Sequence, residues 1–261
     1  MQRELRFLLA LWQANLQSAM EYRAAFFTQV FGMILNNGLY FLFWIVFFQR
    51  FEQVRGYGLS DMALLFGMVA CSFGLGVFFF GNVTNLSEVI SEGKLDYYLS
   101  LPRPVLLHAL ASRSHASGFG DLTYGVISFL VVGPHSLDSA LRFVLGVICG
   151  AAVFIGFLVL VNSLAFWAGS AGQLGQQALT ALVTFATYPV NLFDDAARLV
   201  LFTVMPAALI GTVPSSFVRS FDWSTMALLA FAAIGFLALA IIVFQRGLRR
   251  YESGSAISAQ L

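Results

Sequence analysis

The sequence has little charge. Of its 261 residues, only 10% are charged, whereas 59% are hydrophobic. A soluble domain usually has about 25% charged and about 45–50% apolar residues, so this chain cannot cover a water-facing surface of its size. The same hydrophobicity excludes an intrinsically disordered chain. What remains is a membrane protein, and at about 20 apolar residues per helix the chain has room for several membrane-spanning helices.

Cysteine and excess charge of either sign are scarce as well. The net charge is +1, so the basic surface that a nucleic-acid-binding protein needs is missing. Cys71 and Cys149 both lie inside apolar runs, which is typical of small packing residues and not of a disulfide or a metal site. The apolar run 7–12 is too short for a convincing signal peptide. We therefore predict no nucleic-acid partner and no metal site.

A nucleotide-binding loop is missing too. A P-loop needs two glycines around a backbone cradle, followed by Lys and then Ser or Thr. The only Gly-Lys pair is Gly93-Lys94, but Glu88 stands where the first glycine belongs and Leu95 stands where the hydroxyl belongs. We expect no cofactor in this chain, and ATP, if it drives the protein, is hydrolysed by another chain.

The long apolar runs predict an all-α polytopic membrane protein with six transmembrane helices. The predicted spans are residues 24–48, 60–82, 105–133, 140–168, 173–189 and 224–245. Residues 1–23 are too polar to span, and their leucines recur at helical spacing, so they predict an amphipathic interfacial helix ahead of a transmembrane domain over 24–261. Segment 196–214 is short and contains Pro206, which predicts a re-entrant element before the last helix.

The distribution of Arg and Lys sets the expected orientation. With both termini in the cytoplasm, nine of the 14 basic residues lie on or near the inner side. These nine are Arg3, Arg6, Arg23, Lys94, Arg103, Arg113, Arg246, Arg249 and Arg250. We therefore expect a multi-pass protein of the cytoplasmic (inner) membrane, with residues 83–104 as its longest cytoplasmic loop.

That loop has the signals of a short helix. Asn85 with Glu88 three residues later is a helix start, Gly93 is suited to a helix end, and Pro102 stops a second turn. The segment predicts an amphipathic element at the membrane surface that offers carboxylates and apolar anchors to a cytoplasmic partner. An ordinary solvated loop is the alternative.

Two motifs resemble a known family. The stretch Glu92-Gly93-x-Leu95-Asp96-x-x-Leu99-x-x-Pro102 is similar to the segment after the second span in permease subunits of ABC-2-type exporters. The C-terminal Gly247-Leu248-Arg249-Arg250-Tyr251-Glu252 resembles the end of one branch of that family. The predicted order of an amphipathic N-terminal helix, six spans and a re-entrant element before the last span is similar to that of these permeases over nearly the whole chain.

The resemblance implies a mechanism. Such permeases pair as homodimers or heterodimers, sit in membrane lipid and bind two cytoplasmic ATPase subunits, which hold the ATP and Mg. Segment 84–100 would be the coupling helix, the N-terminal helix would frame the contact, and the re-entrant element would cap the outer end of a pathway. The candidate ATPase-coupling residues are Glu88, Glu92, Gly93, Leu95, Asp96 and Leu99.

Polar residues inside the predicted spans are candidates for a pathway or a subunit interface. Arg113, Ser117 and Asp121 recur every four residues, which would place them in one stripe on a helix. Asn162 lies within the fourth span. Ionisable groups at membrane depth usually face a bundle interior or water. The alternative is that the start of the third span projects into the cytoplasm and is exposed to solvent.

A second set of candidates belongs to an outer gate. These residues are Tyr188, Pro189, Asp194, Asp195 and Pro206. Tyr188-Pro189 is expected to break the fifth span, and the Asp pair could mark an outer vestibule or an ordinary solvated loop. The 28 phenylalanines suit a route for an apolar or amphipathic cargo such as a lipid or a drug, although lipid-facing phenylalanine explains most of them.

Two other functions compete with an exporter subunit. Gly118-Phe119-Gly120-Asp121 matches the Gly-x-Gly-Asp signature of intramembrane aspartyl proteases. That chemistry needs a second carboxylate that shares a proton with the first, and no other Asp is well placed at mid-membrane. An ATP-independent transporter or channel is the other alternative.

Overall fold

The computed structural model describes residues 2–169 and 171–252, and the secondary-structure elements of this part of the chain are helices joined by short loops. Its longer helices are α1 (Gln2–Glu21), α2 (Arg23–Arg50), α3 (Leu59–Phe80), α7 (Ser117–Val132), α8 (Leu137–Ser163), α10 (Gly172–Ala186) and α13 (Trp223–Leu248). The shorter α-helices are α4 (Leu86–Ser91), α5 (Leu95–Leu99), α6 (Val105–Ala111), α9 (Ala165–Ala168), α11 (Asp195–Thr203) and α12 (Thr212–Arg219). Three 3-10 helices, η1 (Gly81–Asn85), η2 (Val190–Leu192) and η3 (Ala207–Leu209), connect them.

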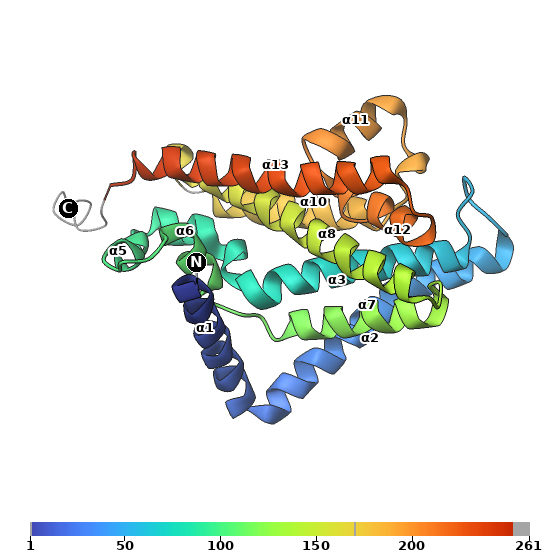
Figure 1. The fold of residues 1–261 in the computed structure, drawn as a ribbon, viewed down its shortest axis with the longest axis horizontal. Coiled ribbons are helices and arrows are strands. Elements are labelled where there is room, and N and C mark those ends of the chain that lie inside the picture. Colours follow the sequence, from blue (N-terminus) through green and yellow to red (C-terminus); the bar gives the residue numbers. More distant parts are fainter. Residues whose placement is uncertain (1, 170, 253–261) are drawn as a thin grey trace.

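Helix α3 is the centre of the bundle (Figure 1). It packs on α7 and α8, while α13 packs on α8 and α2 lies against α7. Glycines let α3 and α7 approach closely, because a Cβ on Gly125 would meet the backbone of Gly67 and a Cβ on Gly118 would meet that of Gly74. Small residues play this part in membrane helix packing, where no hydrophobic force drives helices together.

Within residues 2–169 and 171–252, four helical segments are long and apolar enough to cross a membrane. They are Arg23–Arg50, Leu59–Ser91, Leu137–Ala168 and Trp223–Leu248. The pair Asp195–Thr203 and Ala207–Arg219 passes the same test together but is bent by 67°, so it is either a fifth, broken span or a re-entrant loop. Pro206 lies at the break, where its missing N–H and fixed φ interrupt a helix. The protein is thus an all-helical, multi-span membrane protein.

One predicted span is not a continuous helix. Residues 105–133 form α6 and α7, separated by non-helical residues 112–116. Helix α7 has 16 residues, about 24 Å at 1.5 Å per residue, which is short of a hydrocarbon core of about 30 Å. The predicted span 173–189 is α10, which has 15 residues and ends at Ala186. Apolar composition alone did not show the break at 112–116, because it averages over a turn, whereas the end of α10 falls just before the expected break at Tyr188-Pro189.

Helix α1 packs on the end of the bundle where α3 finishes. Only Tyr22 separates it from α2, and Figure 1 shows the two helices meeting at a sharp angle. The indole nitrogen of Trp12 donates to the carbonyl of Phe79 at 2.7 Å, and Leu8 is buried. Leu5 and Leu9 are more than half exposed. The helix therefore has one apolar side on its own protein and another left open.

Candidate functional site

The loop after α3 folds into a compact unit of η1, α4 and α5, which we call the platform (residues 81–99). Its apolar side chains point inward: Leu86 and Leu95 have no exposed surface, and Val89 and Ile90 are buried. All four belong to the main hydrophobic core of the bundle. Burying a leucine stabilises by about 1.5–3 kcal/mol, so these anchors hold the platform rigidly against the transmembrane helices.

The opposite side of the platform is charged and exposed. Lys94 forms ion pairs with Glu92 at 2.6 Å and with Glu88 at 3.0 Å, and all three side chains are about half exposed. The hydrogen bonds that Lys94 donates to Glu92 and then to Glu88 raise its pKa above the ordinary value. Gly93 makes the turn between α4 and α5 with φ +74°, a conformation that suits glycine. Leu99, at the end of α5, is 44% exposed and adds an apolar contact point to the platform.

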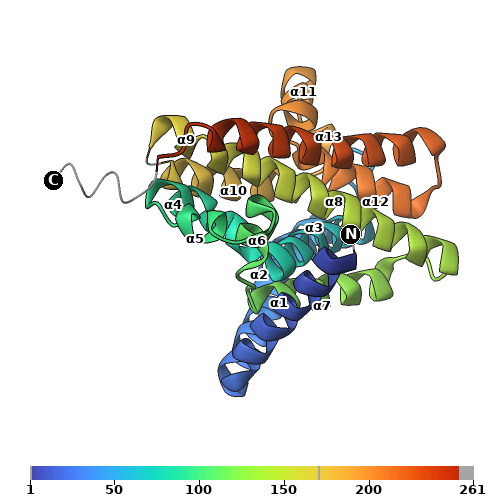
Figure 2. The same ribbon diagram turned by 60° about the vertical axis from the view of Figure 1, so that its left-hand side comes forward.

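The C-terminal motif lies against the platform. The hydroxyl of Tyr251 donates to Oδ1 of Asp96 at 3.0 Å, and burial together with this hydrogen bond raises the pKa of Tyr251 to about 12. Gly247 lies under the ring of Phe166, where no side chain would fit. Figures 1 and 2 show the end of α13 beside the platform helices. The sequence marked the two motifs separately, and no spacing rule could have shown that they touch.

Asn162 attaches the platform to the bundle. Its side chain is buried in α8, and Nδ2 donates to the carbonyl of Val83 at 3.3 Å and to that of Leu158 at 2.9 Å. Gly175 of α10 packs directly on this amide. Asn162 lines neither of the two cavities described below. Its contacts in the structure are those of a packing residue between α8, α10 and η1.

A polar cavity of about 460 Å³ lies between α2, α3, α7 and α10. Asp121 is 2% exposed, and its Oδ1 accepts a hydrogen bond of 2.6 Å from Nδ2 of Asn37, near the midpoint of α2. The second carboxylate oxygen, Oδ2, is buried and has no hydrogen-bond partner among the described residues. Tyr188 and Trp44 meet edge to face at the wall, with ring centroids 5.7 Å apart.

Arg113, Ser117 and Asp121 do not form the predicted stripe. Arg113 lies in the turn between α6 and α7 and is exposed, and Ser117 is the first residue of α7. Only Asp121 reaches the polar cavity. The expectation was wrong because helical spacing has meaning only along an unbroken helix. The side chain paired with Asp121 is an amide, and no second carboxylate lines the cavity in the described part of the chain, so the pair that an aspartyl protease needs is not formed there.

The outer-gate candidates separate into two groups. Tyr188 lines the polar cavity, and Pro189, which is buried, follows it into η2. Asp194 and Asp195 are exposed at the start of α11, where Asp194 accepts from the backbone N–H of Ala197 at 2.8 Å and caps the helix. Asp195 pairs with Arg198 at 3.3 Å. The Asp pair is therefore a helix start on the surface, apart from the cavity wall.

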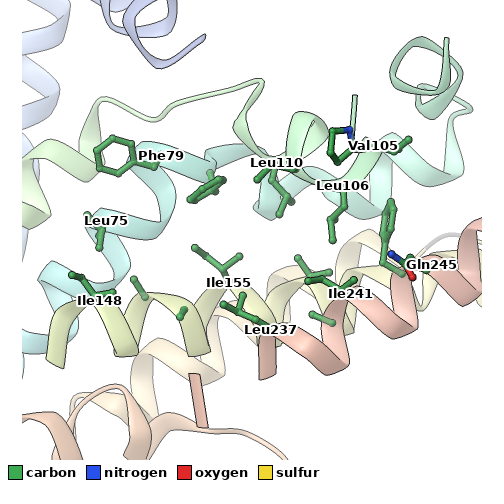
Figure 3. A pocket seen from close by; sticks show the side chains of 18 of the residues that line it. Leu75, Phe79, Val105, Leu106, Leu110, Ile148, Ile155, Leu237, Ile241 and Gln245 are labelled. Atoms are coloured by element: carbon green, nitrogen blue, oxygen red, sulfur yellow. The ribbon is translucent and has the colours of Figure 1, made fainter. Parts of the chain in front are cut away.

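A second cavity, of about 780 Å³, is almost wholly apolar (Figure 3). It lies between α1, α3, α6, α8 and α13, with Phe79, Leu110, Ile155 and Ile241 on its walls. On α3, Leu75 of this cavity comes two positions after Phe73 of the polar cavity, a step that turns through about 200° and so places the two side chains on opposite faces of the helix. The sequence showed neither cavity, although the Asn36-Asn37 pair inside an apolar run was a signal for the polar one.

These features define a polytopic membrane protein with a rigid, charged platform at one end and cavities between its helices. A family model described as ABC-2 family transporter protein matches residues 34–255, and the chain therefore belongs to this family. The predicted family is confirmed, and the chain is a membrane permease of a kind that lacks an ATPase domain and generally works with ATPase subunits. No curated protein and no solved structure matches the chain.

Proposed function

We propose that this chain is the membrane subunit of an exporter that moves an apolar or amphipathic substrate across the cytoplasmic membrane. The energy comes from ATP, held with Mg by separate ATPase subunits. The observation that carries the proposal is the platform, whose inner side is buried in the transmembrane core while its outer side presents Glu88, Glu92 and Leu99. A rigid unit of this kind passes a push from a docked ATPase directly to α3 and α8.

In the proposed assembly, two ATPase subunits dock on two permease chains, either two copies of this one or this one with a paralogue. Segment 84–100 is the coupling segment, in which Leu95 and Gly93 hold the shape and the exposed carboxylates meet the ATPase. Both termini lie on the cytoplasmic side. In support, Glu4 pairs with Arg103 at 2.8 Å and Tyr251 bonds to Asp96, so both ends of the described chain lie near the platform.

The proposed topology keeps six spans. Helices α7 and α10 would be the two short ones beside the four long ones, and the bent pair α11–α12 would be the re-entrant element. Close packing of α7 on α3 supports this, because a helix of 16 residues that is covered by longer neighbours needs no full-length contact with lipid. Helix α1 is the interfacial helix, with Leu5 and Leu9 facing lipid.

The cavities support an apolar or amphipathic cargo. The larger one is walled by aliphatic and aromatic side chains and is near the size of a typical small-molecule site, about 300–1,000 Å³. The polar one places Asp121 at mid-bundle with Tyr188 at its wall, so we propose Asp121 as a pathway residue and Tyr188-Pro189 as part of an outer gate. Pro206, buried at the bend of the re-entrant element, would let that element hinge.

Charge reversal on the platform tests the proposal. Tagged wild-type chain, purified from its own membrane, should carry a P-loop ATPase in equal amount. Glu92→Lys and Leu99→Asp should each lower the amount of bound ATPase and the ATPase-driven transport about tenfold or more, since about 1.4 kcal/mol at an interface is tenfold. Glu52→Lys is the matched control, because Glu52 is exposed in the loop before α3, away from the platform.

The control should keep both the bound ATPase and the transport at wild-type levels. Wild-type chain that carries no P-loop ATPase would contradict the proposal and favour an ATP-independent transporter or channel. Both platform variants binding and transporting like wild type would equally contradict the role of the platform.

A further inference from the structure

We propose that the polar cavity binds the protonated amine of an amphipathic cation, with the carboxylate of Asp121 as its counter-ion. The inference deepens the proposed function and rests on it only in treating the bound cation as cargo. Binding itself needs neither the ATPase nor ATP. The ligand class is an alkylammonium, a positive head that donates hydrogen bonds joined to an apolar tail.

The unused oxygen of Asp121 is the first observation. Asn37 satisfies Oδ1 at 2.6 Å, but Oδ2 is buried and without a partner among the described residues. A buried carboxylate that lacks a cation and lacks part of its hydrogen bonds is costly, so it is normally paired or functional. An ammonium donates up to three hydrogen bonds, as a lysine side chain does, and would supply both the missing donor and the missing charge.

The charge of the cavity wall is the second observation. Among the described residues that line it, Asp121 alone carries a formal charge, and none is Arg, Lys or His. The remaining polar groups are neutral amides and hydroxyls, among them Asn36, Thr184 and Tyr188. A site with one negative charge and several neutral acceptors is complementary to a monovalent cation and repels an anion.

The aromatic wall is the third observation. Tyr40, Phe43, Trp44, Phe66 and Phe73 all line the same cavity. Ring faces attract a cation within about 6 Å, by about 0.5–2 kcal/mol. The same rings accept the apolar tail, which a small inorganic cation does not have.

A metal ion is a poorer fit to these side chains. Calcium takes six to eight oxygen ligands and usually more than one carboxylate, whereas the part of the chain that the structure describes gives this cavity a single carboxylate. No group of three or more His, Cys, Asp or Glu that could hold a metal occurs in the described ranges 2–169 and 171–252. The organic amine therefore matches the cavity better than a bare ion does.

Binding of dodecylammonium to the full-length chain in lipid nanodiscs tests the inference, with 1-dodecanol as the neutral probe of equal tail length. Wild type should bind dodecylammonium about tenfold or more tightly than dodecanol. Asp121→Asn should remove this preference and leave dodecanol binding unchanged. Asp222→Asn is the control, because Asp222 is exposed and caps α13 through the backbone N–H of Thr225, a role that asparagine also fills.

A second measurement keeps the test decisive if Asp121→Asn does not fold. Thr184→Cys places a thiol in the cavity wall at an exposed position, while the native Cys71 and Cys149 are buried. This thiol should react about tenfold faster with a cationic methanethiosulfonate than with an anionic one of similar size, and dodecylammonium should protect it. Asp121→Asn, where it folds, should make the two rates equal.

Equal affinity for dodecylammonium and dodecanol, or equal thiol rates in wild type, would overturn the inference. An unchanged preference in Asp121→Asn would do the same. These outcomes are independent of the docking test. If the chain binds an ATPase but no cation, the exporter function stands and the cargo is a different molecule. If the chain binds the cation but no ATPase, the cation site stands and the proposed exporter function is wrong.

Discussion

Helices α2 and α3 are both long and apolar enough to cross a membrane, yet they have opposite surroundings. Of its 22 residues, α3 buries 13, whereas α2 buries only Phe26 and Trp44 among its 28. Figure 1 shows the reason, since α3 runs through the middle of the bundle and α2 lies along one side. Apolar composition therefore predicts that a helix lies in the membrane, but it does not predict whether the helix is surrounded by protein or by lipid.

The glycines of the two helices show the same contrast. A Cβ on Gly67 or Gly74 of α3 would collide with α7, whereas a Cβ on Gly32 or Gly38 of α2 would have nothing within 4 Å. The main polar attachment of α2 is the hydrogen bond from Asn37 to Asp121. Helix α2 thus packs mainly on α7 and leaves most of its surface open, and its positions can be tested against matched positions on α3 or α7.

The largest effect is expected at the seam between α3 and α7. Gly125→Leu would drive a side chain into the backbone of Gly67 and the sulfur of Cys71, which leaves no room for relaxation. We expect a loss of more than about 4 kcal/mol, seen as aggregation or loss of the monodisperse peak in detergent, because backbone cannot move aside as a flexible side chain does. Gly32→Leu on α2 should purify and unfold like wild type. Equal tolerance of both substitutions would break the contrast.

An intermediate effect is expected at the polar attachment of α2. Asn37→Leu removes the donor to Asp121 and should lower the free energy of unfolding by about 1–2 kcal/mol, measured by reversible unfolding in mixed micelles. Its neighbour Asn36 is exposed and has no hydrogen bond to Asp121, so Asn36→Leu should cost less than about 0.5 kcal/mol. An equal or larger cost for Asn36→Leu would show that the hydrogen bond does not hold α2.

The smallest effect is expected on the open face of α2. Phe31 is 67% exposed, so Phe31→Ala should change the free energy of unfolding by less than about 0.5 kcal/mol in the same micelle assay. Met68 of α3 has no exposed surface, and Met68→Ala should cost about 2–5 kcal/mol through the cavity it leaves. A large cost at Phe31 would mean that this face is covered by protein in the assayed state.

Local features of the fold could be predicted from the sequence. The apolar runs marked α2, α3, α8 and α13, and the signals around Gly93 marked the short helices of the platform. Pro206 and the shortness of its segment marked the bend between α11 and α12. These predictions depend on hydropathy and on residues with restricted backbones, which act over a few residues and need no knowledge of neighbours.

Predictions about the candidate site held less well. Asp121 was singled out for its charge at depth, and it does line a cavity. Arg113 was joined to it by spacing, but the turn at 112–116 separates them. The partner of Asp121, Asn37, lies 84 residues away, and Tyr251 meets Asp96 across 155 residues. Pairings over such distances depend on how helices cross, which no local pattern contains.

The sequence by itself determined that this protein lies in a lipid bilayer and where its long helices are. Its scarce charge and long apolar runs would not be stable in water. It also carried enough of the two motifs to indicate the family. The tertiary structure alone decided which apolar helix is buried, which polar groups meet, and where cavities remain. An apolar helix is about equally stable in contact with lipid and with protein. Its packing partners are therefore decided by the fit of small residues and by a few hydrogen bonds.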